Sequence, residues 1–119
     1  MTVDVDALAH NALLKTGAQV GFMIYGGGQV PYIAYQRILE QDQAFADDDG
    51  QAVEHHYRAS LFAKGSYRHI LATAKTELKR AGFYGISINA DSYEKDTALF
   101  HVSFDFSYMT DVDDTESEV

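Results

Sequence analysis

The chain has 119 residues, of which 46% are hydrophobic, and it contains no cysteine. This length suits one ordinary domain with a packed core, and the lack of cysteine excludes disulfides and thiolate chemistry. Nine basic and 18 acidic residues give a formal charge of −9, which argues against gripping nucleic acid through its phosphates. No apolar run approaches the roughly 18 residues of a membrane span, and no basic n-region of a signal peptide begins the chain. We therefore expect a soluble protein made inside the cell.

The acidic charge is concentrated at the C-terminal end. Positions 110–119 carry five acids, including Asp113 and Asp114, and no base. Such a stretch has little to bury and repels itself. We predict a single domain over 1–109 and an acidic flexible tail over 110–119. The tail either is a solvated end that aids solubility or becomes ordered against a basic partner or a neighbouring subunit.

The first third of the chain predicts one helix and two strands. Apolar residues recur at helical spacing over 4–16, and Gly17 follows as a stop. A short apolar run over 20–25 ends in three glycines, which indicates a strand and a turn. The run 30–39 is rich in strand formers, and Pro31 should stand at its start because proline cannot donate to a sheet ladder.

A long hairpin with an acidic tip is predicted next. Over 53–63 one face carries Val53, His55, Tyr57, Ala59 and Leu61, and the other carries Glu54, His56, Arg58 and Ser60. This alternation is typical of a strand with one buried face. The preceding loop, 43–52, contains Asp47, Asp48 and Asp49. A solvated hairpin tip is the simplest interpretation of those acids.

The most regular pattern is a helical stripe in the second half of the chain. Its members are Tyr67, Ile70, Leu71, Ala74, Leu78 and Ala81. Ser66 is the expected N-cap and Gly82 the expected end of this helix. Two strands should follow. In 84–91, Ile86 and Ile88 share one face. In 97–109, the apolar face carries Ala98, Phe100, Val102, Phe104, Phe106 and Tyr108.

The predicted element order is therefore α-β-β-β-α-β-β. Short connections between successive strands favour antiparallel pairing. Two amphipathic helices and a sheet with one apolar face form an α+β two-layer sandwich, with both helices packed on the same face of a mainly antiparallel sheet.

Known chemical motifs are not matched. The glycines at 26–28 are not followed by Lys-Ser/Thr or by a helix, so a phosphate loop is not expected. With Gly50 sixth in a calcium loop, Phe45 and His56 would occupy the two positions that need acidic ligands, which excludes an EF-hand. No nucleophile elbow is present. We assign no catalytic, cofactor-binding or metal-binding residue, and expect no enzyme.

The histidines do not predict a metal centre either. His55 and His56 are neighbours on a strand, so they point to opposite faces and cannot chelate one ion. His55 and His101 have the option of meeting across strands, but nothing in the sequence requires it.

Four segments in this order resemble the small tail-completion or tail terminator proteins of long-tailed bacteriophages and prophages. The segments are Val30–Tyr35 (VPYIAY), Tyr57–Phe62 (YRASLF), Leu78–Phe83 (LKRAGF) and Phe100–Phe106 (FHVSFDF). The resemblance spans roughly residues 4–109. It implies a structural protein of the virion neck, made in the host bacterial cytoplasm, with no cofactor and no catalysis.

The resemblance also implies partners. Such proteins form a ring, typically a hexamer, that caps the tail tube protein and faces the head connector or head-completion protein, while DNA passes through the channel without specific binding. Negative charge along a channel would keep the duplex from sticking. The interface is expected to be heterologous.

Candidate contact residues come from the loop, the tail and exposed aromatic positions, because tyrosine is enriched at interfaces. They are Asp47, Asp48, Asp49, Phe62, Tyr93, Asp113 and Asp114. Two alternatives stay open. One is another neck or minor tail component, and the other is a small α+β ligand-binding module or enzyme.

Overall fold

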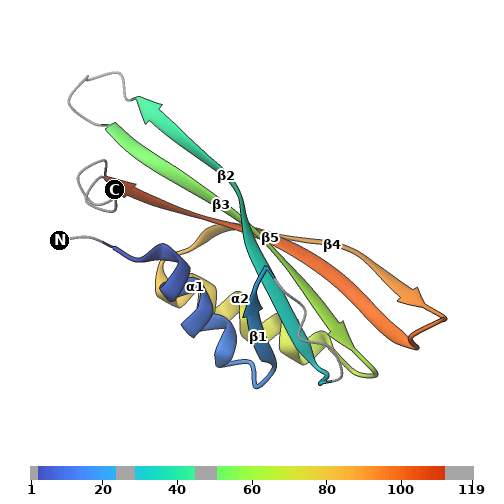
Figure 1. Cartoon of the computed structure of the whole chain (residues 1–119). Helices are drawn as coiled ribbons and strands as arrows, with labels where there is room; N and C mark the ends of the chain where they lie inside the picture. Colours follow the sequence, from blue (N-terminus) through green and yellow to red (C-terminus); the bar gives the residue numbers. More distant parts are fainter. Residues whose placement is uncertain (1–2, 24–28, 45–50, 112–119) are drawn as a thin grey trace.

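The computed structural model describes residues 3–23, 29–44 and 51–111. Their elements follow the predicted order, and the α+β architecture with a mainly antiparallel sheet is confirmed (Figure 1). The elements are α1 (Val5–Leu14), β1 (Gln19–Phe22), β2 (Tyr32–Ala44), β3 (Gln51–Ala63), α2 (Arg68–Ala81), β4 (Tyr84–Glu94) and β5 (Leu99–Asp111). Asp47, Asp48, Asp49, Asp113 and Asp114 lie outside the described residues.

Helix α1 begins where a side chain supplies the missing hydrogen bond. The Asp4 carboxylate accepts from the Ala7 N–H at 3.1 Å, which satisfies a donor that has no partner within the helix. The apolar face expected from the sequence is the buried one, with Ala9 and Leu13 fully inaccessible. This face packs on the sheet and α2 and holds α1 against the core.

Helix α2 corrects one prediction. Ser66 is not its N-cap, because the helix begins at Arg68 and Tyr67 occupies the cap position without a side-chain cap bond. The Tyr67 carbonyl instead accepts from two backbone N–H groups of the first turn, and its ring packs 5.5 Å from that of Phe100. Tertiary packing therefore fixes the start of this helix. Gly82 ends it in the left-handed conformation, at φ 110°, as predicted.

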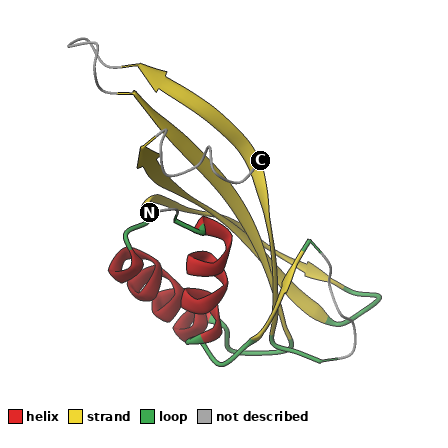
Figure 2. Ribbon diagram, turned by 60° about the vertical axis from the view of Figure 1, so that its left-hand side comes forward, coloured by secondary structure: helices red, strands yellow, loops and turns green. Residues whose placement is uncertain are grey.

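The five strands form one sheet in the order β1-β2-β3-β5-β4. Only β1 and β2 are parallel; the other neighbours pair antiparallel. Both helices lie on the same face of the sheet (Figure 2). The core between the layers is aromatic at its centre, where Tyr57, Phe104 and Phe106 are almost completely buried. We call the face that points away from the helices the open face.

The alternation of buried and exposed side chains matches the sequence prediction closely in β3 and less closely in β4 and β5. Ala98 is not part of the apolar face of β5, because it lies in the turn before the strand with φ 59°. Ile86 is half-buried, but Ile88 is 44% exposed. Two register shifts interrupt the pairing of β4 with β5, and such bulges bend a strand and re-aim its side chains.

The sheet is longer than the helices that cover it. Strands of 13 residues span about 43 Å, whereas the 14 residues of α2 span about 21 Å. The molecule measures 51 × 25 × 23 Å. The β2–β3 hairpin therefore extends past the helices at one end, and the β4–β5 hairpin extends past them at the other (Figure 1).

Candidate interaction surfaces

The open face is polar and its side chains bind one another. Arg58 on β3 donates from Nε and Nη2 to the two carboxylate oxygens of Asp105 on β5, at 2.8 and 3.0 Å. One row away, Asn89 donates to the Ser103 hydroxyl at 2.8 Å. These exposed pairs link neighbouring strands and leave the face hydrophilic, which suits contact with water or a wet interface better than a dry core.

The densest polar cluster of this face joins four strands, β2, β3, β4 and β5. The His56 imidazole lies 2.7 Å from the Ser107 hydroxyl and 3.1 Å from a Glu54 carboxylate oxygen. Glu54 also accepts hydrogen bonds from Tyr84 and from Gln43. Partial burial and the bond to Glu54 raise the pKa of Tyr84 to about 12. The Tyr84 hydroxyl therefore stays a donor over the whole physiological range.

Ser107 contacts His56, and His56 contacts Glu54. This serine–histidine–acid arrangement is the one that activates the nucleophile of many hydrolases. Its surroundings do not favour that chemistry. Ser107 is 8% exposed and lies in the interior of the sheet, paired with His56 on one side and Tyr84 on the other. Strand pairing on both sides engages the backbone N–H groups that would otherwise form an oxyanion hole. The cluster acts as a cross-strand brace.

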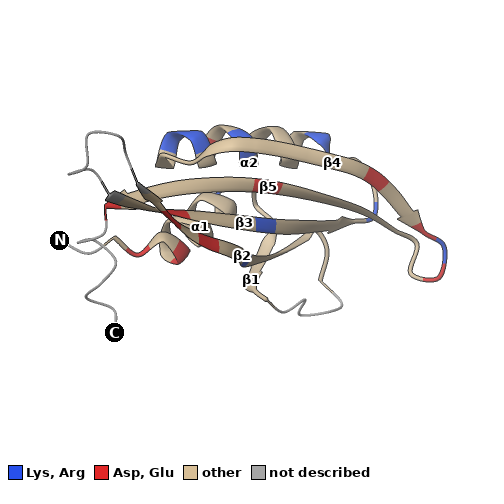
Figure 3. Cartoon of the chain, turned by 90° about the horizontal axis from the view of Figure 1, so that it is seen from above, with Lys and Arg blue, Asp and Glu red and all other residues tan. Residues whose placement is uncertain are grey.

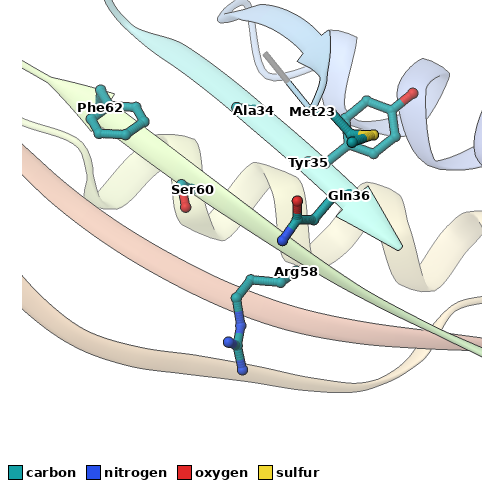
Figure 4. A pocket seen from close by; sticks show the side chains of 7 residues that line it. All are labelled: Met23, Ala34, Tyr35, Gln36, Arg58, Ser60 and Phe62. Carbon is teal, nitrogen blue, oxygen red and sulfur yellow. The ribbon is translucent and has the colours of Figure 1, made fainter. Parts of the chain in front are cut away.

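A shallow depression of about 220 Å³ lies on the open face beside β1. It is lined by Met23, Ala34, Tyr35, Gln36, Arg58, Ser60 and Phe62. Six of the seven labelled side chains are spread along β2 and β3, Met23 follows β1, and they do not converge on one point (Figure 4). Small-molecule sites are usually deeper and hold convergent polar groups, so the depression is a weak candidate for a ligand pocket.

His55 and His56 point to opposite faces of the sheet, as the strand pattern predicts. The structure also shows that His55 and His101 do not meet, a question that the sequence left open. His55 faces the core, 3.0 Å from the Thr110 hydroxyl and 3.6 Å from a Glu40 carboxylate oxygen, while His56 faces the open side. His101 pairs with Phe62 and stacks on its ring at 4.6 Å, far along β5 from Tyr108, the strand partner of His55.

Among residues 3–23, 29–44 and 51–111, no group of three or more His, Asp or Glu is placed to hold a metal ion. Neither described helix has the length and apolar character that a membrane crossing requires.

Two of the predicted contact residues are described, and they lie on different parts of the surface. Phe62 is half-buried near the end of β3 and covers His101. Tyr93 is 52% exposed on β4 and packs 4.9 Å from Phe100. The structure therefore does not bring them together. Several other tyrosines belong to the core, including Tyr35 and Tyr57.

Exposed apolar side chains that the sequence did not single out lie near the end of the β2–β3 hairpin. Leu39 is 50% exposed and Met109 is 38% exposed. A bulge between Arg37 and Leu39 shifts the alternation of β2 by one residue, so Leu39 pairs with His56 on the open face. Sequence periodicity gives no signal for such a shift.

Charge is divided between different parts of the surface (Figure 3). Five of the nine Lys and Arg residues fall between positions 64 and 80, on α2 and just before it. No Lys or Arg occurs between positions 38 and 57, where six acids occur. The hairpin is therefore acidic and the outer surface of α2 is basic. Of those six acids, Glu40, Asp42 and Glu54 lie in the described part of the chain.

Solved structures with a similar fold are known, although the sequence itself finds no match. No protein-family model and no curated protein matches the sequence. The fold is similar to a chain of a solved structure described as "Virion of native gene transfer agent (GTA) particle", over 92% of this chain and 99% of that one. The TM-score is 0.46 and the sequence identity is 10%, so no functional argument is drawn from it.

Proposed function

We propose that this protein is a structural subunit of a tailed-phage or prophage virion, acting as a tail terminator ring that caps the tail tube and meets the head connector. The proposal starts from the sequence resemblance, whose four segments fall on β2, β3, the end of α2 and β5. Those elements supply much of the core and the three inner strands of the sheet.

The observation that carries the proposal is the shape of the surface, which is extended and has a shallow depression on the open face. The sheet extends past its helices at both ends, and the depression of about 220 Å³ on its open face is shallow and lacks convergent groups. A subunit that works by contact needs extended, chemically distinct surfaces, whereas an enzyme needs a pocket that excludes water. The net charge of −9 also suits a ring through which DNA passes without adhering.

Deletion of the gene in the bacterium that carries it tests the role directly. We expect negative-stain electron microscopy of induced particles to show tails of uncontrolled length, and a plasmid copy of the gene to restore normal length. Tails of normal length joined to heads would contradict the proposal. Heads and normal-length tails that remain unjoined would favour another neck component instead.

The hydrolase alternative rests on the contacts between Glu54, His56 and Ser107. Complementation with Ser107→Ala separates the two functions, because removal of one hydroxyl abolishes a serine nucleophile but only weakens a brace. We expect this variant to restore tail length. Loss of function by a variant that is folded and present at normal amount would favour the enzyme.

A further inference from the structure

One side of α2 carries a row of cations that lie beside a free sheet edge. Arg68, Lys75 and Lys79 are spaced by seven and four residues, which places them on one side of the helix. That side is turned toward β4, because Arg68 Nη2 lies 3.5 Å from a carboxylate oxygen of Asp91 on β4. Lys75 and Lys79 are exposed and have no ion-pair partner in the described part of the chain.

Exposed apolar side chains border this row. Ile88 and Tyr93 lie on either side of Asp91 in β4, and their cross-strand partners Phe104 and Phe100 belong to the helix-facing side of the sheet. Ile88 and Tyr93 are therefore on the same side of the sheet as α2. We call Arg68, Lys75, Lys79, Ile88 and Tyr93 the basic flank.

The opposite chemistry occurs at the end of the β2–β3 hairpin. Glu40, Asp42 and Asp111 are exposed there. Glu40 already pairs with Arg37 at 2.6 Å, whereas no ion-pair partner of Asp42 or Asp111 occurs in the described part of the chain. Leu39 and Met109 supply exposed apolar surface on the open face, where Asp111 also lies, whereas Glu40 and Asp42 lie on the helix-facing side of the same end. We call these five residues the acidic end. Like the basic flank, it combines charge with apolar area, as protein interfaces do.

We propose that the basic flank of one copy binds the acidic end of the next copy. This inference rests on the proposed ring and identifies the two surfaces that would close it. A symmetric pairing of two basic flanks or two acidic ends would oppose like charges, whereas flank-to-end pairing matches them. Such a contact is heterologous, and repeated rotation by the same angle closes it into a ring. The charges orient the subunits, and the acidic end presents carboxylates on both of its faces and apolar side chains on the open face.

Disulfide trapping tests the contact even if free rings are short-lived, because the chain has no cysteine of its own. Asp42→Cys and Lys79→Cys are purified separately, mixed and oxidised. We expect a cross-linked heterodimer on a non-reducing gel, several-fold more abundant than that from Asp42→Cys mixed with the control Asn11→Cys, an exposed site on α1. A yield equal to the control, or a majority of Asp42→Cys homodimers, would overturn the proposal.

Charge reversal gives a second, independent readout in complementation. Lys75→Glu with Lys79→Glu should abolish control of tail length, and adding Asp42→Lys with Asp111→Lys in the same chain should restore it, because the two surfaces are again opposite. Failure of the fourfold variant to rescue, with normal folding by circular dichroism, would refute the pairing. Cross-linking without any tail phenotype on deletion would reject the proposed function and keep the contact, so the two failures are distinguishable.

Discussion

The Tyr57 hydroxyl donates a hydrogen bond to the Asp6 carboxylate, which ties the central strand β3 to helix α1 across 51 positions of sequence. Asp6 also accepts from Arg37 Nη2 on β2 at 3.0 Å. One carboxylate therefore joins the helix to two strands. Because the Tyr57 ring is completely buried, its hydroxyl depends on this acceptor.

We expect Asp6→Asn to destabilise the protein by about 1–3 kcal/mol, because the charged acceptor of two hydrogen bonds is lost. Urea unfolding followed by circular dichroism measures the change. Asp42→Asn is the matched control, since the Asp42 side chain is exposed and makes no hydrogen bond within the described part of the chain. Equal midpoints for the two variants would show that the Asp6 contacts contribute nothing.

The same contacts predict a loss of stability in alkali. Burial, followed by the charges of Asp6 and Asp4, raises the pKa of Tyr35 from 10.0 to about 12. Burial and the bond to Asp6 likewise raise the pKa of Tyr57. A raised pKa in the folded state means that the stabilisation is complete below pH 10 and is lost as the pH rises from about 10 toward 12.

Urea unfolding at a series of pH values should therefore show a fall in unfolding free energy that begins near pH 10. Absorbance of tyrosinate in the same samples should rise together with unfolding. Tyr35→Phe should reduce this fall in unfolding free energy, because it removes one of the two tyrosine hydroxyls whose pKa is raised. A flat free energy up to pH 12 is the result that contradicts this assignment.

Core packing gives a larger expected effect. Phe106 is fully buried, lies parallel to the Tyr57 ring with centroids 5.4 Å apart, and meets Phe83 edge-on at 5.2 Å. Phe106→Ala should cost about 3–5 kcal/mol, because it removes buried area and leaves a cavity. Phe22→Ala is the control, since Phe22 is 43% exposed on the edge strand β1. A loss from Phe106→Ala no larger than the control's would show that the aromatic stack is not central to the core.

Alanine substitutions at three glycines distinguish the cost of an unfavourable backbone conformation from the cost of a steric contact. Gly82 has φ 110°, and a Cβ there would lie 3.0 Å from the Tyr108 ring. Gly17 has φ 87° with nothing within 4 Å, and Gly65 has free space without a positive φ. We expect the loss of stability to follow the order Gly82→Ala, then Gly17→Ala at about 1 kcal/mol, then Gly65→Ala near zero. Thermal unfolding of the three variants tests that order.

Most elements were predictable because their signals are local. The alternation over 53–63 determined which side of β3 is buried, and the stripe from Tyr67 to Ala81 determined the buried side of α2. Gly82 marked the end of that helix because only a residue without Cβ adopts its backbone angles easily. Each of these depends on residues within a few positions of one another.

The surfaces were less predictable because they depend on pairing between distant segments. The bulge beside Leu39, the exposure of Ile88 and the contacts of His56 with Glu54 and Ser107 each require a strand register that no local pattern specifies. The start of α2 depended on Tyr67 meeting Phe100 and not on Ser66.

The sequence by itself determined the order of the elements and the buried face of most of them, since hydrophobic burial at fixed periods of 2 and 3.6 residues leaves few alternatives. Only the tertiary structure decided where charge and apolar area meet on the outside. That outcome depends on how far the long strands extend past the short helices, and on which segments lie side by side once the sheet has twisted.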